Sequence, residues 1–462
     1  MSEWKLRPEI PEWFQDAKLG MFFHWGPYSV PAYDNEWYSR NMYVKDHKDN
    51  KYHREHYGST SEFGYKDFIP MWKGEAFDPE VWAQLAELAG AKYAGAVSEH
   101  ADNFAMWDSE VNPVNSVKMG PGRDVVGECF EAFQKKGIKC LATFHHQWLW
   151  GWFMGSDLEG DVYDPANEIY YGPITDRETA DYLPEIKPGK EFNEIWLAKV
   201  LEVVDKYNPD VVYFDSRASI IPDSYKQKVC EAVYKREDTV ITYKGNDFPE
   251  GAGVKDVEVR RFPDKRKFYW QEDDKLEVNN SWMYTIDGSY KPSRQIIHEL
   301  CDIVAKNGNL LLNVGPKADG SFAREAVESI KGLGDWLRVN GEAIYGTRPY
   351  EVCEEGPVSV KDMEHYINDT GQDCVLEDSI GNFCGEDVRY TKKGDNVYAI
   401  ILGMPKAGSI LLRAFAEGRH NISKVTMVGL DEKIEWQQEK DGIRICFPKK
   451  LPCEHAYVFR LQ

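Results

Sequence analysis

Short apolar runs alternate with amphipathic stretches along most of the first 345 residues of the chain. The runs have the length and apolar content of strands buried on both faces of a parallel sheet. They lie at residues 21–23, 93–97, 140–144, 211–214, 240–243, 254–259, 267–270 and 309–316. Apolar residues at helical spacing occur at 80–91, 124–137, 193–207, 222–236 and 293–306, and a short helix is expected to end at Gly20. This alternation predicts an α/β fold with a TIM-like (β/α) barrel. The sequence alone does not give a count of exactly eight strand–helix units.

The pattern changes after about residue 346. Short strands separated by turn signals are expected at 396–402, 409–415, 423–428, 434–437, 443–447 and 455–461. Such spacing predicts an antiparallel β-sandwich. We therefore expect a barrel-like domain at residues 1–345 and a C-terminal β-sandwich domain at 346–462 that braces the barrel. The loops at 34–75 and 150–190 are long enough to carry further elements.

Charge and cysteine usage restrict the classes of partner and compartment. The formal net charge of −21 argues against nucleic acid or an anionic membrane as a partner. Nine cysteines without a CxxC pair indicate free thiols in a reducing compartment. The first residues contain no apolar signal-peptide core, so we expect a cytoplasmic protein. The sequence leaves open whether the chain forms a homo-oligomer.

Aromatic residues make up 13% of the chain, with 15 Trp and 26 Tyr. Flat apolar faces beside hydroxyl and indole donors suit sugar rings, although aromatic residues also fill cores and interfaces.

Polar side chains follow several of the predicted strands. They are His24, His100, His145, His146, Asp215, Asp256, Glu258 and Glu272. Each is alone more often structural, and Asp215 also has the position of a helix N-cap. In a (β/α) barrel, however, the carboxyl ends of all strands share one rim, where catalytic groups lie. A rim of carboxylates, imidazoles and indoles without glycine-rich phosphate loops is suited to hydrolysis of a neutral sugar.

Several motifs together resemble glycoside hydrolase family 29, the α-L-fucosidases. They are Gly-Met-Phe-Phe-His-Trp-Gly at 20–26, Glu-Trp-Tyr at 36–38, His-Ala-Asp-Asn-Phe-Ala-Met-Trp-Asp at 100–108, Tyr-Phe-Asp at 213–215, Ser-Trp-Met-Tyr at 281–284 and Gly-Asn-Leu-Leu-Leu-Asn-Val-Gly-Pro at 308–316. The resemblance implies a barrel-like catalytic domain followed by a β-sandwich. It also implies retaining hydrolysis that releases terminal α-L-fucose from fucosylated glycans or oligosaccharides.

The resemblance also implies roles for individual residues. Asp215 matches the nucleophile of the family. The residues that match contacts to the sugar are His24, Glu36, Trp37, His100, Tyr213, Trp282 and either Arg260 or Arg261.

One departure from the family pattern lies in the sugar pocket. Many members have paired histidines where this chain has His100 and Ala101. We therefore expect His145 or His146 to occupy the vacated space.

A second departure concerns the acid/base. Many members have a glutamate where this chain has Gln271, which cannot transfer a proton. Glu258 and Glu272 are the candidates, and we favour Glu258 because the valines on either side favour its protonated form. Glu272 precedes two aspartates, which is typical of a more solvated loop. If neither Glu258 nor Glu272 is the acid/base, Glu36 and Asp256 are the next candidates.

Neither a cofactor nor a metal ion is expected. The histidines lack metal-ligand spacing along the chain, and retaining hydrolysis by two carboxylates needs no Lewis acid. Two alternative functions stay open. One is a catalytically impaired fucose-binding homologue that lost its acid/base at Gln271, and the other is a related glycosidase for α-L-galactosides with room made by Ala101.

Overall fold

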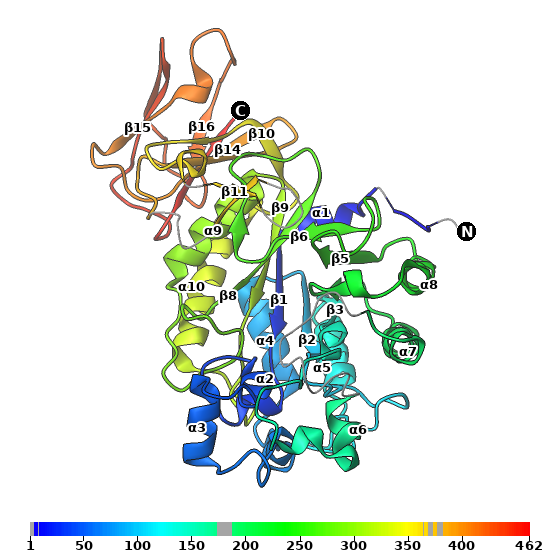
Figure 1. Cartoon of the computed structure of the whole chain (residues 1–462). Coiled ribbons are helices and arrows are strands. Elements are labelled where there is room, and N and C mark those ends of the chain that lie inside the picture. The colour runs from blue at the N-terminus through cyan, green and yellow to red at the C-terminus, as the bar shows by residue number, and fades with distance from the viewer. Residues whose placement is uncertain (1–3, 8, 173–186, 364, 368–372, 377–381) are drawn as a thin grey trace.

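Eight parallel strands close into a barrel in the computed structural model, which describes residues 4–7, 9–172, 187–363, 365–367, 373–376 and 382–462 (Figure 1). In order around the barrel the strands are β1 Leu19–Phe23, β2 Tyr93–Glu99, β3 Lys139–Phe144, β4 Val211–Phe214, β5 Val240–Lys244, β6 Val254–Asp256, β8 Trp270–Lys275 and β9 Gly308–Asn313. Closure comes from the pairing of β1 with β9, which aligns Phe22 with Asn313. The predicted TIM-like barrel is confirmed, and the structure supplies the count of eight.

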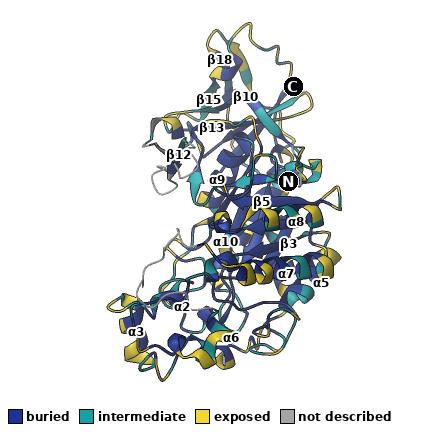
Figure 2. Cartoon of the chain, turned by 45° about the vertical axis from the view of Figure 1, so that its right-hand side comes forward, coloured by how far each residue is buried: buried dark blue, intermediate teal, exposed yellow. Residues whose placement is uncertain are grey.

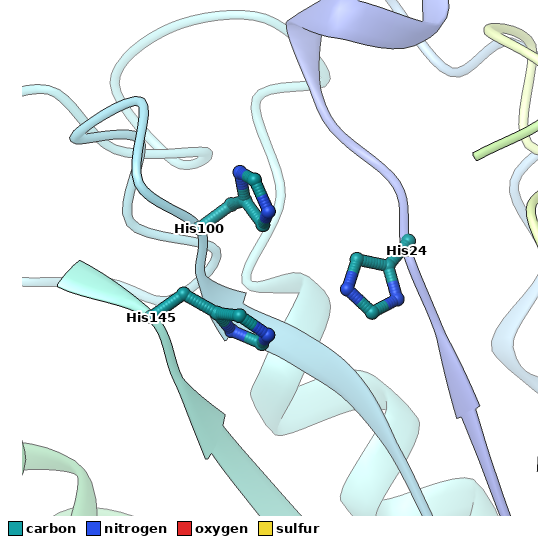
Figure 3. Close-up of side chains that lie close together, drawn as sticks. All are labelled: His24, His100 and His145. Carbon is teal, nitrogen blue, oxygen red and sulfur yellow. The ribbon is translucent and has the colours of Figure 1, made fainter. Parts of the chain in front are cut away.

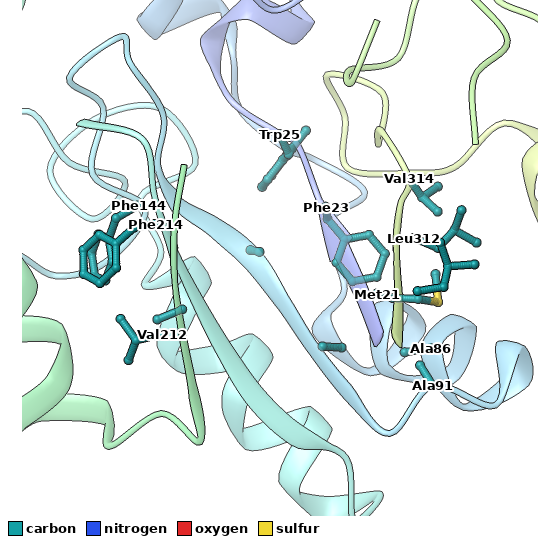
Figure 4. Packing of buried hydrophobic residues seen from close by; sticks show 14 of the residues in the cluster. Met21, Phe23, Trp25, Ala86, Ala91, Phe144, Val212, Phe214, Leu312 and Val314 are labelled. Atoms are coloured by element: carbon teal, nitrogen blue, oxygen red, sulfur yellow. The ribbon is translucent and has the colours of Figure 1, made fainter. Parts of the chain in front are cut away.

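Side chains alternate between the two faces of each barrel strand. Phe22, Tyr213 and Leu311 belong to an apolar cluster that fills the barrel interior. Their neighbours point outward, and Figure 4 shows Phe23 among the buried side chains of the layer between strands and helices. This alternation decides which of the residues at each strand end face the centre of the barrel.

Most helices around the barrel bury one face and expose the other, as Figure 2 shows for α5 and α7, whereas α9 is buried from Ile296 to Ala305. The helices are α4 Pro79–Ala89, α5 Val125–Lys135, α7 Lys190–Tyr207, α8 Asp223–Val233, α9 Ser293–Ala305 and α10 Arg324–Asn340, with α1 Glu12–Ala17 before β1. The first five match predicted helices, whereas α10 was not predicted. Within the described ranges, no helix combines the length and the apolar content needed to cross a bilayer.

Strand β8 corrects the prediction for this part of the chain. A strand was expected at 267–270 with Glu272 in a solvated loop, but β8 begins at Trp270 and its acidic residues are buried. Burial of successive carboxylates is costly unless each meets a cation. Cations lie beside all of them: Arg261 contacts Glu272, the Nζ atom of Lys244 lies 3.0 Å from Asp273, and that of Lys291 lies 2.6 Å from Asp274.

Both long loops carry short helices. The loop after β1 holds α2 Tyr38–Asn41, α3 Lys48–His56 and the 3-10 helices Pro27–Ser29 and Tyr65–Met71. The loop after β3 holds 3-10 helices at His146–Leu149, Asp161–Tyr163 and Pro165–Asn167 and the helix α6 Glu168–Tyr171. In Figure 1, α2, α3 and α6 lie together at the end of the barrel opposite the C-terminal strands. The rim is therefore covered by its own loops.

Antiparallel sheets form the C-terminal part of the chain. A five-stranded sheet has the order β10 Arg348–Glu355, β13 Val388–Lys393, β14 Asn396–Ile401, β19 Tyr457–Leu461 and β16 Val425–Met427. A second sheet has the order β15 Ser409–Leu412, β18 Gly442–Cys446 and β17 Trp436–Glu439. Apolar side chains from both sheets share one core, as in a sandwich. A small sheet of β11 Tyr366–Ile367, β12 Asp373–Leu376 and β7 Arg260–Arg261 links this part to the barrel domain.

Buried charges join the two domains. Arg389 of β13 is fully buried, and its Nε atom donates to Asp302 of α9 at 2.5 Å. The Nζ atom of Lys306 lies 3.0 Å from Asp302 and 3.3 Å from Glu354 of β10. Each charge in this cluster meets at least one opposite charge, so the C-terminal domain is fixed to α9 by contacts that neither domain makes alone.

Removal of Arg389 tests this connection. Arg389→Ala leaves buried carboxylates short of one cation, so we expect a loss of about 3–5 kcal/mol in the free energy of unfolding. Thermal and urea denaturation of the full chain measure it. Arg324→Ala, which breaks the exposed pair with Glu328, is the matched control and should leave the melting temperature unchanged. Equal effects of both variants would contradict the interpretation.

Candidate active site

Side chains along each barrel strand alternate between the interior and the exterior of the barrel. This alternation directs several of the polar residues after the strands to the centre of the rim. Phe22 and Tyr213 face the barrel interior, and His24 and Asp215 follow each of them by two positions. Side chains two positions apart share a face. The strands therefore aim an imidazole and a carboxylate at the same space.

A register shift in β2 has the same result for His100. Val97 faces the interior, so regular alternation would turn Glu99 inward and His100 outward. The pairing of β2 with β3 shifts between Val97 and Glu99, and the extra residue exchanges the two faces. Glu99 consequently points outward, where its Oε1 atom lies 2.5 Å from the Nζ atom of Lys199 on α7.

Three imidazoles meet at the rim, one from the end of each of β1, β2 and β3 (Figure 3). The ring centroids of His24, His100 and His145 lie 5.1–5.7 Å apart. The Nδ1 atom of His24 lies 2.7 Å from the Oδ1 atom of Asn313, which leaves its Nε2 atom toward the shared space. Burial lowers the pKa of His24 to about 4 and the pKa values of His100 and His145 well below the usual range. All three rings are therefore neutral near pH 7.

Of the two histidines expected in the sugar pocket, only His145 faces the rings of His24 and His100 (Figure 3). His146 points away from the barrel centre, where its Nε2 atom lies 3.2 Å from the carbonyl oxygen of Trp196 and its ring stacks on that indole. The placement of His146 in the sugar pocket was wrong, because consecutive residues at a strand end face opposite sides.

Lys244, at the end of β5, holds three carboxylates together. Its Nζ atom lies 2.9 Å from Asp215, 2.8 Å from Glu258 and 3.0 Å from Asp273. Burial opposes the charged amine, but these carboxylates outweigh it and raise the pKa of Lys244 well above its ordinary value. The ammonium ion is therefore permanently charged and keeps Asp215 beside a positive neighbour.

Asp215 is oriented through both of its oxygens. Oδ1 contacts the Nζ atom of Lys244, and Oδ2 accepts a hydrogen bond from the indole Nε1 of Trp148 at 2.7 Å. A carboxylate with fixed partners on both oxygens has one orientation toward the pocket. This is the geometry that a nucleophile requires.

Glu258 lies beyond the end of β6 but keeps the direction of the strand. The N–H groups of Val257 and Val259 donate to carbonyl oxygens of Gln271 and Asp273, so pairing with β8 continues past Asp256. Val259 then adopts φ 49°, a left-handed conformation that is strained for a β-branched residue, and the chain turns away into β7. Glu258 thus faces the same side as Asp256.

The environment of Glu258 suits a proton donor. Burial raises its pKa, and the neighbouring carboxylates Asp273 and Asp215 add to the shift against the opposing effect of Lys244. Since Asp215 and Glu258 touch the same Nζ atom, their contacting oxygens lie no further apart than those two contact distances combined. That limit is comparable to the separation of about 5–5.5 Å between the two carboxyl groups of retaining glycosidases.

Gln271 and Asp256 form a polar layer below the catalytic rim. The hydroxyl of Tyr93 donates to Oε1 of Gln271, and Nε2 of Gln271 donates to Asp256 at 2.6 Å. Burial raises the pKa of Asp256 well above its usual value, and Asp273 adds to the shift. Asp256 therefore favours its neutral form below the site, and Gln271 donates to its Oδ2 atom.

Glu272 is excluded as the acid/base by the alternation of β8. Its neighbours Gln271 and Asp273 face the interior, whereas Glu272 points outward and pairs with Arg261. Arg260 lies in β7, opposite Leu376 of β12. Lys244 holds the cationic position at the rim that an arginine was expected to fill.

The remaining predicted residues form the side of the pocket. The N–H group of Trp282 donates to Oε2 of Glu36 at 2.9 Å, and its indole lies 5.5 Å from the ring of His24. Burial raises the pKa of Glu36 to about 7. The indole of Trp37 lies 5.4 Å from that of Trp148. Two aromatic faces thus flank the space between the imidazoles and Asp215.

Four residues of the site were not assigned from the sequence: Lys244, Asp273, Asn313 and Trp148. Lys244 and Asn313 end barrel strands, so the same strand-end signal that marked Asp215 was available for them. Asp273 lay in a run interpreted as a loop. Nothing in the sequence places the indole of Trp148 against Asp215.

Removal of the shared cation should have a pH-dependent effect on stability. Lys244→Met removes the counter-charge that Glu258 shares with Asp215 and Asp273, which raises the folded-state pKa of Glu258 further. An acid whose pKa is higher in the folded than in the unfolded state lowers the free energy of unfolding at high pH. This loss becomes smaller as the pH falls through the folded-state pKa. We expect the deficit in melting temperature to be largest near pH 8 and to shrink toward pH 5. Lys255→Met on β6 is the control, and a pH-independent deficit would contradict this.

Comparison with known proteins identifies the family of the chain. Residues 2–342 match the Alpha-L-fucosidase family, and residues 382–462 match the Alpha-L-fucosidase C-terminal domain. The tissue α-L-fucosidases of Rattus norvegicus and Homo sapiens are 28% identical over 98% of this chain and over 90% and 89% of their own lengths. The crystal structure of Thermotoga maritima α-fucosidase in complex with fucose is 26% identical, with a TM-score of 0.73 over 98% of this chain and 97% of that one. The chain belongs to the α-L-fucosidase family.

Proposed function

We propose that the chain is a retaining exo-α-L-fucosidase that releases terminal α-L-fucose from fucosylated glycans or oligosaccharides. The observation that carries this proposal is the pair of carboxyl groups, Asp215 and Glu258, held on one ammonium group at the rim. Retaining hydrolysis needs a nucleophile and a proton donor at this separation.

In the first step, an oxygen of Asp215 attacks the anomeric carbon while Glu258 protonates the departing glycosidic oxygen. The bond between that oxygen and the anomeric carbon breaks, and an ester between fucose and Asp215 forms. Trp148 and Lys244 hold the carboxylate in place for the attack. Because its pKa is raised, Glu258 keeps the proton that the leaving group needs.

In the second step, water replaces the leaving group. Glu258, now ionised, removes a proton from the water, which attacks the anomeric carbon and releases the carboxylate of Asp215. Two inversions give net retention. Glu258 is then protonated again, and Lys244 lies beside the released carboxylate of Asp215.

The pocket suits a neutral deoxy sugar. The neutral imidazoles of His24, His100 and His145 donate to or accept from hydroxyl groups without binding an anion. The indoles of Trp37 and Trp282 supply apolar faces for the ring and its methyl group.

Two alternatives make different predictions. A fucose-binding homologue would have lost its proton donor at Gln271, but Glu258 stands in a position to replace it. A glycosidase for α-L-galactosides would use space at Ala101. A panel of fucosyl oligosaccharides with aryl α-L-fucoside and aryl α-L-galactoside, assayed for released sugar, separates these functions from the fucosidase.

The proposed compartment is reducing. Five cysteines, Cys129, Cys140, Cys230, Cys301 and Cys353, are buried as free thiols, which supports this proposal. A homo-oligomer stays open, and size-exclusion chromatography with light scattering measures it.

Loss of the nucleophile should abolish covalent catalysis. For Asp215→Ala we expect a loss of about 10³-fold or more in kcat on an aryl fucoside. Added azide should restore part of the turnover and yield the β-fucosyl azide, because the small anion enters the space of the missing carboxylate. Near-normal activity of the variant would remove Asp215 from the mechanism.

Loss of the proton donor should discriminate between substrates. Glu258→Ala should strongly reduce hydrolysis of natural fucosides but largely spare fucosylation of the enzyme by an aryl fucoside with a good leaving group. The alkaline limb of the pH dependence of kcat/KM, which reports the protonated acid, should disappear.

Glu272→Gln is the matched control for this prediction. It leaves Arg261 buried without its partner, so we expect a lower melting temperature and no substrate selectivity. If Glu272→Gln rather than Glu258→Ala lost activity on natural fucosides selectively, Glu272 would be the acid/base in place of Glu258.

A further inference from the structure

We propose that His24, His100 and His145 form a binding site for one divalent transition-metal ion of the zinc class, and that the bound ion excludes the sugar. The second part rests on the proposed function of the pocket, whereas the first part does not. Hydrolysis itself is not assigned to the ion, because the two carboxyl groups are sufficient for it.

The geometry of the three rings is that of an open metal site. Their ligand atoms all lie within 4.8 Å of one another, and the side chains come from three adjacent barrel strands (Figure 3). Around tetrahedral zinc, nitrogens at about 2.0–2.1 Å lie roughly 3.3 Å from one another. Closing on an ion therefore needs each ring to move inward by less than about 1 Å. Three imidazoles with a free fourth position are a known zinc coordination set.

The rings are in the chemical state that a metal needs. The Nδ1 atoms of His100 and His145 are buried and have no hydrogen-bond partner among the described residues. The contact between Nδ1 of His24 and Oδ1 of Asn313 fixes one tautomer, with a lone pair on Nε2. A carbonyl oxygen behind the distal ring nitrogen is the usual outer-shell support of a metal-bound histidine.

The surrounding charge favours a cation. Asp215, Glu258 and Asp273 share the single ammonium group of Lys244, so the rim carries more negative than positive charge. A divalent ion at the imidazoles would therefore be attracted by the same carboxylates.

Sugar and ion would compete because they use the same atoms. The ring nitrogens that coordinate a metal are those available to fucose hydroxyl groups, and both ligands need the space between the rings and Asp215. Occupancy by zinc should therefore raise the apparent KM for an aryl fucoside without lowering kcat.

Calorimetric titration of the chelator-treated full chain with zinc chloride tests the site. We expect one ion per chain, with affinity lowered at least about 100-fold in His145→Gln. His146→Gln is the matched control, because that ring lies next in sequence but outside the cluster, and it should bind zinc as the wild type does. If circular dichroism shows that His145→Gln is unfolded, His100→Asn replaces it.

Cobalt(II) distinguishes imidazole from thiolate ligands. Visible bands of a tetrahedral site without sulfur charge-transfer absorption are expected, and they should decline as L-fucose is added. Sulfur bands, equal affinity in His145→Gln and wild type, or more than one equivalent bound at the same affinity would overturn the site. Zinc binding that L-fucose does not weaken would overturn the competition. Zinc binding in a chain that hydrolyses no fucoside would contradict only the proposed function.

Discussion

The ammonium group of Lys244 is the interaction on which the catalytic rim depends. Three carboxylates, Asp215, Glu258 and Asp273, lie within 3.0 Å of it. Without a cation, adjacent buried carboxylates repel one another and take up protons, so neither a fixed nucleophile nor a defined proton donor would persist. One buried cation contacts both Asp215, the proposed nucleophile, and Glu258, the proposed acid, whose pKa is raised. The separation of roles between two identical functional groups follows from this arrangement.

The same constraint continues away from the rim. Outward-facing Glu272 and Asp274 of β8 each meet a cation, and Glu99 meets Lys199 on α7. At the domain junction, Arg389 and Lys306 balance Asp302 and Glu354. A chain with a net charge of −21 can bury these acidic groups because each of them lies beside a cation.

Alternation and its interruption explain how the site is assembled. Inward positions of β1 and β4 lead directly to His24 and Asp215, whereas the register shift in β2 is needed to turn His100 inward. The left-handed residue Val259 ends the pairing after Glu258 and sends the chain out to β7. Local departures from regular strand geometry therefore occur at residues that face the substrate.

The fold class and most candidate residues of the site could be predicted from the sequence. Buried strands and amphipathic helices have distinct periods, and a polar residue at a strand end marks the rim, so Asp215, His24 and Glu258 were assigned from local pattern and from resemblance. Only the tertiary structure decided the roles of Glu272, His146 and Lys244. Which face a side chain takes depends on register and bulges, and whether a buried charge is compensated depends on residues from other strands. The meeting of three histidines separated by many residues in the chain is likewise a result of barrel closure, which sequence spacing does not contain.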